Sequence, residues 1–331
     1  MNFADITSIE NIFQAWSEFR RGKRKIADVQ SFERHLEDNL FELHRKLKDK
    51  TYRHGNYSAF FVHDPKRRHI HKANVADRII HHLLYKYLYE LFDKSFIFDS
   101  YSCRLDKGTH KAVKRLEKFT KIVSKNYTKP CWALKLDIKK FFANVDHGIL
   151  KELLRKKIID SNILWLLDEV INSFSSGTKG TPYEARGIPL GNLTSQVFAN
   201  IYMNELEQFI KHELKSKYYL RYADDFIMLS PCSNDSNQWV KEIEQFLKEQ
   251  LKLELHPNKI ILRNLNWGID FLGYIVLPHY ILPRTKTKKR IFRKLNSKNL
   301  QSYLGFLSHA NSFKLILELQ NQVWFRKENL L

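Results

Sequence analysis

One stretch decides the fold class of this chain: Tyr222-Ala223-Asp224-Asp225-Phe226, which lies between the apolar runs 218–222 and 226–229. Two apolar runs separated by a short polar turn predict a β-hairpin, here with carboxylates at its tip. An Asp-Asp pair by itself usually marks a solvated turn, because aspartate is common in turns. Here strand-like runs and aromatic residues enclose the pair on both sides, which argues against that interpretation.

A further acidic residue, Asp137, ends another strand-like run, Trp132-Ala133-Leu134-Lys135-Leu136. If this strand and the hairpin are neighbours in one sheet, Asp137, Asp224 and Asp225 converge. Such close like charges repel strongly unless a cation lies between them. Hard divalent cations prefer oxygen ligands, and two ions about 3.5–4 Å apart can activate a 3′-hydroxyl and stabilise a leaving pyrophosphate. The pattern therefore predicts a two-metal site.

The remaining periodicity predicts helices, then a mixed centre, then basic helices. Apolar residues three and four apart predict helices at these positions: Ile9, Ile12, Phe13, Trp16 and Phe19; Phe32, Leu36, Leu40, Leu43 and Leu47; 75–92; and Phe198, Tyr202, Leu206 and Phe209. A hairpin is expected over 58–72, with its turn at Asp64-Pro65-Lys66. Ile260-Ile261-Leu262 and 271–277 are further strand candidates. This order favours an α+β architecture.

The formal net charge is +20, from 56 Lys and Arg against 36 Asp and Glu. Such an excess predicts attraction to a polyanion, with nucleic acid as the expected partner. An anionic membrane surface and a merely basic surface are the alternatives. The run Arg284, Lys286, Lys288, Lys289, Arg290, Arg293 and Lys294 suits a helix or loop that grips a nucleic-acid backbone, although charge runs often form solvated faces.

Several classes of protein are disfavoured. The cysteines Cys103, Cys131 and Cys232 are odd in number and far apart, so neither a disulfide framework nor a zinc site is expected. The histidines of the first third lack typical zinc spacing, so they are interpreted as surface or core residues, a few near RNA. The start of the chain does not resemble a signal peptide, and no apolar run is long enough for a membrane span. A cytoplasmic protein is expected.

Four motifs carry a resemblance to reverse transcriptases. Tyr222-Ala223-Asp224-Asp225 resembles their YxDD box, and Leu136-Asp137-Ile138-Lys139-Lys140-Phe141-Phe142 resembles their first palm motif. Residues 187–196, Gly-Ile-Pro-Leu-Gly-Asn-Leu-Thr-Ser-Gln, resemble the family motif that closes on the template base and the incoming nucleotide. Phe271-Leu272-Gly273-Tyr274 resembles the primer-grip turn. All four stand in the family's order, and the resemblance covers roughly 55–310.

The resemblance implies a right-hand polymerase with fingers, a palm made of an antiparallel sheet plus helices, and a short helical thumb. The expected division is a helical N-terminal extension over 1–55, fingers over 56–130 with part of 175–200 packed nearby, a palm over 131–280 and a basic thumb over 281–331. The implied activity is RNA-directed DNA polymerisation. The implied ligands are template RNA, the cDNA primer–template, dNTPs and two Mg²⁺ ions, with Mn²⁺ as a possible substitute.

The family's metal ligands carry over to four positions. Asp137 and Asp224 would bridge the metals, Asp225 would support them, and the backbone carbonyl of Ile138 would complete one metal shell. Lys259 resembles the lysine that protonates the leaving pyrophosphate, a general-acid contribution of roughly 10²–10⁴-fold. A lone lysine is more usually a solvated charge, and that alternative stays open.

The substrate-binding residues carry over in the same way. Phe142, five residues after Asp137, would be the steric gate that excludes a ribose 2′-OH, whereas Phe141 is expected in the core; a plain core role for Phe142 is the alternative. Arg68 and Arg78 would neutralise the triphosphate, and a structural salt bridge is the alternative for Arg78. Within the nucleotide-closing motif, the substrate-binding positions are Leu190, Gly191 and Gln196.

The subtype rests on the same motif. Group II intron and retron enzymes usually carry glutamine at the place of Leu190 and end the motif in Ser-Pro, whereas this chain ends it in Gln196. That form, the modest length and the tail 302–311 resemble reverse transcriptases of diversity-generating retroelements, which are bacterial or phage-encoded. Those enzymes copy a template-repeat RNA with errors at adenines, diversify a target gene, and work with a small basic accessory protein, the variability determinant.

An apolar residue at 190 would loosen selection, because discrimination built on hydrogen bonds is large and apolar pockets discriminate weakly. A group II intron-like, retron or phage-defence reverse transcriptase is the nearest alternative. A catalytically silent binding module and a basic structural RNA-binding protein are alternatives from other classes.

Overall fold

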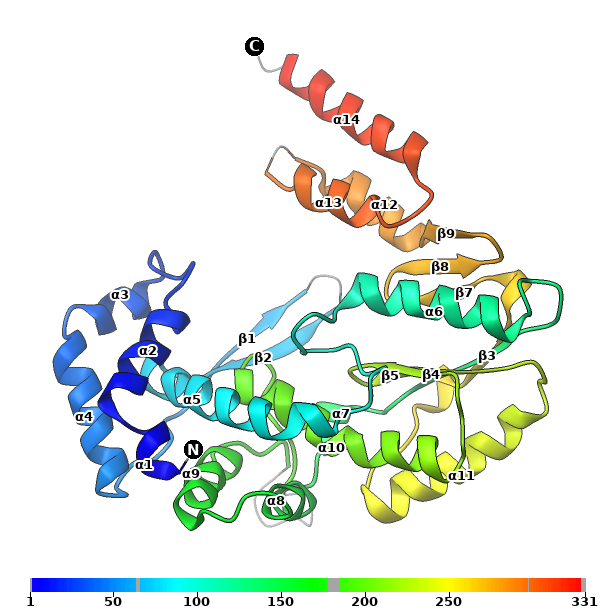
Figure 1. Ribbon diagram of the computed structural model, residues 1–331. Helices are drawn as coiled ribbons and strands as arrows, with labels where there is room; N and C mark the ends of the chain where they lie inside the picture. The colour runs from blue at the N-terminus through cyan, green and yellow to red at the C-terminus, as the bar shows by residue number, and fades with distance from the viewer. Residues whose placement is uncertain (1, 64–65, 178–184, 297, 329–331) are drawn as a thin grey trace. The chain divides into compact units, whose positions relative to one another are not determined.

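The computed structural model describes residues 2–63, 66–177, 185–296 and 298–328, and the chain forms two compact units (Figure 1). The first unit comprises Met1–Phe98, Ile138–Phe209 and Glu244–Glu254. The second comprises Asp99–Asp137, Ile210–Ile243 and Leu255–Leu331. The chain passes between the units repeatedly, so neither unit is one continuous segment. The division into fingers, palm and thumb stays a prediction.

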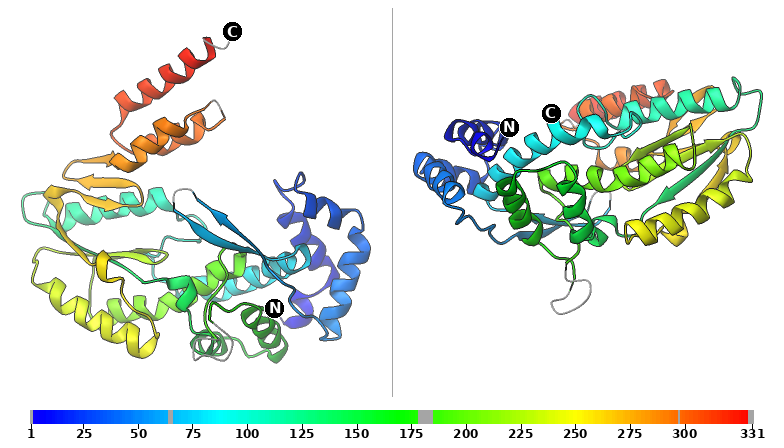
Figure 2. Two further views of the ribbon diagram at one scale, coloured as in Figure 1. Left: turned by 180° about the vertical axis from the view of Figure 1, so that it is seen from behind. Right: turned by 60° about the horizontal axis from the view of Figure 1, so that its bottom comes forward.

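Helices at the start of the first unit gather around one end of a long central helix, as Figures 1 and 2 both show. They are α1 (Phe3–Ile6), α2 (Ile9–Phe19), α3 (Ala27–Glu33), α4 (Leu36–Lys48) and the central α5 (Val75–Phe92). Their apolar faces are buried, including Ile12, Trp16 and Leu40. The prediction of one helical face from Phe32 to Leu47 is wrong at its start. His35 adopts φ −123° and ψ 45°, so Phe32 belongs to the preceding helix.

The hairpin predicted over 58–72 is confirmed. Strands β1 (Ser58–Val62) and β2 (Arg68–Lys72) pair antiparallel, with Phe61 opposite His69. Of its predicted turn, Asp64 and Pro65 lie outside the described residues. The rest of the first unit is helical: η1 (Asp93–Ser95), α7 (Phe141–Asn144), α8 (His147–Arg155), α9 (Ser161–Asn172), most of α10 (Leu193–His212) and the end of α11 (Asp235–Gln250). Residues 178–184, within the segment predicted to pack near the fingers, lie outside the described part.

A four-stranded antiparallel sheet forms the centre of the second unit. Its order is β4-β5-β3-β6, made of β4 (Tyr219–Tyr222), β5 (Asp225–Ser230), β3 (Trp132–Asp137) and β6 (Ile261–Asn264). Helix α6 (Thr109–Val123) packs against β4 and β5, and its Leu116 and Phe119 share one buried cluster with Leu220 and Ile227. This core holds the strand ends that carry the acidic residues.

A second sheet, order β7-β8-β9, continues the same buried cluster on the other side of α6 (Figure 1). Its strands are β7 (Ile269–Phe271), β8 (Tyr274–Leu277) and β9 (Tyr280–Pro283), and the short helices η2 (Pro257–Lys259) and η3 (Leu265–Trp267) precede it. The strand predicted over 271–277 is therefore wrong as one element. Leu272 and Gly273 have φ values of 50° and 92°, which make a tight type I′ turn.

Three helices end the second unit: α12 (Thr285–Lys294), α13 (Leu300–Leu307) and α14 (Phe313–Glu328). Ile291, Leu295, Leu307 and Leu319 form their small core. The predicted basic run lies mainly on α12, whose Thr287 and Ile291 are buried. Arg284 pairs with Asp270 at 2.8 Å, so this one cation is already engaged within the protein.

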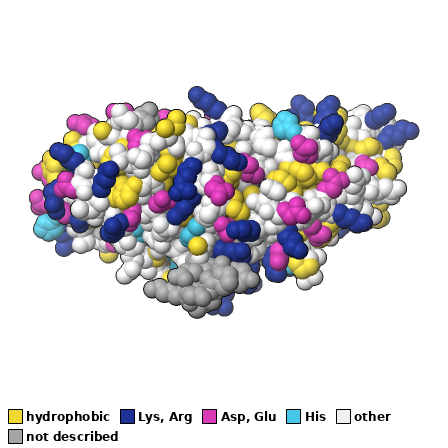
Figure 3. Space-filling view, turned by 90° about the horizontal axis from the view of Figure 1, so that it is seen from below, with side chains coloured by type: hydrophobic (Ala, Val, Ile, Leu, Met, Phe, Trp, Pro, Cys, Tyr) yellow, Lys and Arg dark blue, Asp and Glu magenta, His cyan; other side chains and the backbone are white. Residues whose placement is uncertain are grey.

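Surface charge, helix hydropathy and the cysteines add three observations. On the described part of the face in Figure 3, Lys and Arg side chains are intermixed with Asp and Glu, so that face offers no continuous basic surface. Within the described residues, no helix combines the length and the apolar character needed to cross a bilayer. Cys103, Cys131 and Cys232 are all free thiols.

Candidate active site

Two of the acidic residues, Asp137 and Asp225, lie opposite each other at the ends of neighbouring strands in the second unit. Strand β3 pairs with β5 so that Asp137 stands directly opposite Asp225, and Tyr222 stands opposite Asp225 across the hairpin. Ala223 and Asp224 form the two-residue turn between them. Directly opposite residues in an antiparallel pair have Cβ atoms about 4.5–5.5 Å apart. The strand that ends at Asp137 and the hairpin that carries Asp224 and Asp225 are therefore neighbours in one sheet, as the sequence analysis required for a shared site.

The turn that carries Asp224 is strained and supported from within the core. Ala223 has φ +57°, a left-handed conformation that disfavours residues other than glycine. Arg221 is fully buried, and its Nη1 donates to the carbonyl oxygen of Ala223 at 2.9 Å, while its Nη2 donates to Ser100 Oγ at 2.9 Å. Ser100 lies in a segment that bridges to Arg221 in parallel. The sequence did not predict a role for Arg221, because nothing in the pattern around it indicates that this arginine is buried.

Lysines stand against two of the carboxylates. Lys259 Nζ lies 2.6 Å from Asp137 Oδ1, and Lys135 Nζ lies 3.1 Å from Asp225 Oδ2. Burial raises the pKa of Asp225 to about 6; the adjacent Lys135 ammonium opposes this shift, and the nearby charges of Asp137 and Asp224 add to it. The buried position of Asp225 therefore makes its ionised form energetically unfavourable.

The donor set suits a hard divalent cation. Asp225 Oδ1 is buried and has no hydrogen-bond partner among the described residues, so it is a carboxylate oxygen with a vacant ligand direction. Oxygen donors of this kind are what Mg²⁺ prefers. Among the described residues, no three His, Cys, Asp or Glu side chains are grouped as a metal site. Asp137 is paired with Lys259, and Asp225 is paired with Lys135.

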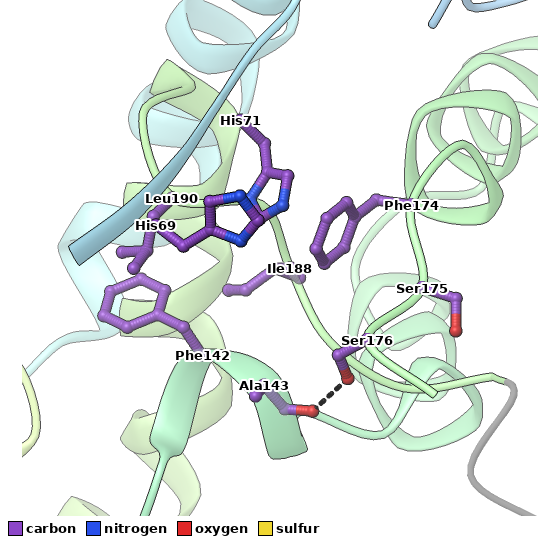
Figure 4. A pocket seen from close by; sticks show the side chains of 9 residues that line it. All are labelled: His69, His71, Phe142, Ala143, Phe174, Ser175, Ser176, Ile188 and Leu190. Atoms are coloured by element: carbon purple, nitrogen blue, oxygen red, sulfur yellow. Dashed lines mark hydrogen bonds between the residues drawn. The ribbon is translucent and has the colours of Figure 1, made fainter. Parts of the chain in front are cut away.

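A cavity of about 370 Å³ in the first unit collects other predicted residues (Figure 4). Phe142 and Leu190 both line it, and the rings of His69, His71 and Phe174 face it. The remaining lining residues are Ala143, Ser175, Ser176 and Ile188. A concave, largely apolar pocket with a few polar groups is the usual form of a small-molecule site. Phe141 is buried in the core, as expected, whereas Phe142 is half-buried at the cavity.

The loop before α10 is tied to strand β2. His71 N donates to the carbonyl oxygen of Leu190 at 2.8 Å, and Asn192 Nδ2 donates to the carbonyl oxygen of His71 at 2.8 Å. Gly191 has φ +113°, and a Cβ placed there would stand 2.7 Å from Ile70 Cγ2. Both features require glycine at 191. They hold the Leu190 side chain at the cavity.

The other predicted contact residues lie in different settings. Arg68 is exposed on β2, and Gln196 is exposed on the first turns of α10. Arg78 forms a salt bridge with Asp28 and lies over the ring of Phe19. The structural alternative for Arg78 is thus the arrangement observed. Ile138, the first residue after β3, is buried.

The predicted primer-grip turn joins β7 to β8. Phe271 and Tyr274 are register partners, and both are fully buried. Tyr274 stacks on Phe306 of α13 at 4.4 Å between ring centroids, and its hydroxyl donates to the Phe306 carbonyl oxygen at 2.7 Å. The turn is therefore fixed to the C-terminal helices of its own unit.

Comparisons with known proteins bear on this geometry. The family model described as "Reverse transcriptase (RNA-dependent DNA polymerase)" matches residues 63–276, well over half of the chain. Protein YkfC of Escherichia coli is 22% identical over 232 residues, which cover 60% of each chain. The group II intron-encoded protein LtrA of Lactococcus lactis is 23% identical over 303 residues, covering 72% of this chain and 49% of LtrA. The chain thus spans about half to three fifths of these relatives.

Solved structures share the fold. Telomerase from Candida albicans, solved with a fragment of telomeric RNA, has a TM-score of 0.53 at 14% identity, covering 83% of this chain and 55% of that one. Apo telomerase from Candida tropicalis has a TM-score of 0.52 at 15% identity, covering 81% and 56%. The mixed helices and antiparallel sheet thus correspond to the right-hand polymerase fold, as predicted.

Proposed function

Because the chain belongs to the reverse transcriptase (RNA-dependent DNA polymerase) family, we propose that it copies an RNA template into DNA from dNTPs, using Asp137, Asp224 and Asp225. One observation carries this proposal most directly: the pairing of Asp137 with Asp225 at the hairpin tip, with one Asp225 oxygen left without a partner. Carboxylates in such an arrangement are costly to keep unless they bind cations.

Two divalent cations, Mg²⁺ with Mn²⁺ as a substitute, would supply activation of the primer 3′-hydroxyl and charge neutralisation at the leaving pyrophosphate. Asp137 and Asp224 would hold them, with Asp225 in support and the Ile138 carbonyl completing one shell. Lys259, whose Nζ lies 2.6 Å from Asp137 Oδ1, would act as the general acid for the leaving pyrophosphate.

Substrate selection would fall to the cavity of the first unit. The Phe142 ring would exclude a ribose 2′-OH, and Leu190, Gly191 and Gln196 would belong to the nucleotide-binding motif. Arg68, exposed on β2, is the stronger triphosphate ligand. Arg78 is the weaker one, because its guanidinium already pairs with Asp28.

Nucleic-acid contacts complete the proposal. The turn Phe271-Leu272-Gly273-Tyr274 would hold the primer end, since its packing against α13 keeps it rigid. The basic side chains of α12 would contact the backbone of the primer–template, so binding would weaken steeply with added salt.

The finer proposal is a diversity-generating retroelement enzyme of bacterial or phage origin, acting in the cytoplasm with a small basic accessory protein. It would copy a template-repeat RNA with errors at adenines. Its support is the Leu190 side chain at the cavity, where a hydrogen-bonding residue would discriminate more strongly. A group II intron-like role is the second candidate, favoured by the similarity to LtrA.

Primer extension on a defined RNA template, followed by sequencing of the product, tests both levels. We expect Mg²⁺-dependent dNTP incorporation by the wild type and none above background by Asp224→Ala. Equal activity in the two proteins would refute the metal-site assignment, and no incorporation by either would favour a non-catalytic RNA-binding protein. Errors concentrated at template adenines, and reduced in Leu190→Gln, would support the finer proposal; an unchanged error rate in Leu190→Gln would remove it.

A further inference from the structure

We propose that His71 contacts a nucleobase in the cavity lined by Phe142 and Leu190, and that its Nδ1 atom supplies a hydrogen bond to that base. This inference rests on the proposed polymerase function and names a further nucleotide-binding residue for it. The resemblance to reverse transcriptases assigned no role to this position.

The first observation is a continuous chain of rings leading into the cavity. Phe61 stacks on His69 with centroids 4.5 Å apart and planes 15° apart. His69 meets His71 edge to face at 4.3 Å, and His71 meets Phe174 at 4.7 Å. In Figure 4 the two imidazole rings overlap, and the ring of Phe174 lies beside them. Successive rings of this kind suit base stacking, which is worth roughly 1–3 kcal/mol per base in nucleic-acid-binding proteins.

The second observation is an unsatisfied polar atom. His71 Nδ1 is buried and has no hydrogen-bond partner among the described residues. Buried polar groups almost always have a partner, so one left open beside a cavity indicates a ligand. The neighbouring hydroxyl of Ser176 is already engaged, because it donates to the carbonyl oxygen of Ala143 at 2.5 Å.

The third observation is that His71 is held in place. Its backbone N–H donates to Leu190 and its carbonyl oxygen accepts from Asn192, so two hydrogen bonds join strand β2 to the loop before α10. The ring itself is held between His69 and Phe174. The unpartnered nitrogen therefore keeps a fixed position relative to Leu190, which a contact to a bound base requires.

The charge state of His71 suits this role. Burial lowers the pKa of His71, and the neighbouring His69 lowers it further, so the imidazole is neutral near pH 7. A neutral imidazole has one N–H donor and one acceptor nitrogen, and either tautomer is accessible. Nδ1 can then donate to a base oxygen or accept from a base amino group. Such a contact adds affinity for several bases while discriminating weakly among them.

The test compares variants that separate ring packing from hydrogen bonding. His71→Phe keeps an aromatic ring at this position and removes Nδ1. His71→Asn places an amide nitrogen near the Nδ1 position, and His71→Gln places one near Nε2 instead. His35→Phe, on an exposed residue at the start of α4, is the matched control. Thermal melting of each variant establishes that it is folded, and the Asn–Gln pair gives the same contrast if Phe is not tolerated.

Single-nucleotide extension with each of the four dNTPs, on templates carrying each of the four bases, gives the result. We expect KM for dNTP to rise roughly 3- to 10-fold in His71→Phe, the size of one lost hydrogen bond. We expect kcat to change little, and His71→Asn to recover KM better than His71→Gln. If the rise in KM depends on which dNTP is used, the incoming base is the ligand of His71. If the rise depends on which template base is used, the template base is the ligand.

Two negative results have different meanings. If the wild type extends no primer, the proposed function itself fails. If the wild type extends primers while His71→Phe keeps the wild-type KM and misincorporation spectrum for all dNTP and template combinations, the polymerase stands and the role of His71 is overturned.

Discussion

Replacing Arg221 with lysine should reduce catalysis although the residue touches no substrate. Arg221 is fully buried, and its two guanidinium nitrogens donate to the carbonyl oxygen of Ala223 and to Ser100 Oγ, both at 2.9 Å. A lysine keeps the charge, but its single ammonium cannot reproduce the planar fork. At most one of these contacts survives in Arg221→Lys.

The magnitudes follow from the geometry of the turn. The left-handed conformation of Ala223, φ +57°, costs about 1–2 kcal/mol. A hydrogen bond from a charged donor contributes about 1.5–3 kcal/mol, so the bond from Arg221 is large enough to offset that strain. Loss of it should destabilise the protein by about 1.5–3 kcal/mol and let the turn relax. Because Asp224 is the next residue, a displacement near 1 Å would lower kcat by about 10²-fold.

The assay is primer extension as a function of Mg²⁺ concentration, alongside urea unfolding. We expect Arg221→Lys to lower kcat and to raise the Mg²⁺ concentration needed for half-maximal activity. Arg45→Lys is the matched control, because Arg45 contacts Glu42 on helix α4 through two nitrogens, both at 2.9 Å. It should keep both kinetic parameters. A folded Arg221→Lys with wild-type kcat and Mg²⁺ dependence would refute the reasoning.

Three further predictions concern the first unit. Gly191→Ala should destabilise the protein by about 1–3 kcal/mol in urea unfolding. The φ of +113° at this position is strained for alanine, and the new Cβ would clash with Ile70 Cγ2. Adding Ile70→Ala should recover only the part of the loss that is due to the clash. Phe142→Val should lower the ratio of kcat/KM for dNTP over rNTP by at least about 10-fold, whereas an unchanged ratio would mean a plain packing role. Burial, with help from the charge of Lys23, lowers the pKa of His82 to about 4, while the unfolded chain titrates near 6.5. Between pH 4 and pH 6.5 the unfolded state therefore binds more protons than the folded state. The stability that the neutral His82 contributes is fully present above about pH 6.5 and is lost as pH falls towards 4. Between pH 7.5 and pH 5.5 the free energy of unfolding should fall by at most about 1.4 kcal/mol for this reason. His82→Phe should flatten the pH dependence of the melting temperature by that share, and an unchanged slope would contradict it.

Local pattern predicted the elements that carry the carboxylates. The alternation at 132–136 and the paired apolar runs around Asp224 and Asp225 are signals of short range, and strands β3, β4 and β5 form where they indicate. The pairing of Asp137 with Asp225 confirms that the strands are neighbours. Pattern failed where a turn lies inside an apolar run. Leu272 adopts φ 50° although nothing in its type favours that conformation, so one predicted strand became two.

Contacts between distant segments could not be predicted. Arg78 pairs with Asp28, and Arg221 bonds to Ser100, across wide sequence separations. Neither partner is marked by spacing or composition, because the choice depends on how helices and strands pack. The unpartnered Nδ1 atom of His71 could not be predicted from the sequence either. Only the cavity around it distinguishes this histidine from the others in the first third of the chain.

The lysines beside the carboxylates offset part of the repulsion within the acidic cluster. Lys259 and Lys135 place ammonium groups against Asp137 and Asp225, so part of the surplus positive charge is used inside the protein. A divalent cation that binds these carboxylates must displace or share those contacts, which weakens its binding. An arriving triphosphate would bring both the cation and the negative charge that the released lysines need. Cation and nucleotide should therefore bind cooperatively, each tightening the other by the same factor.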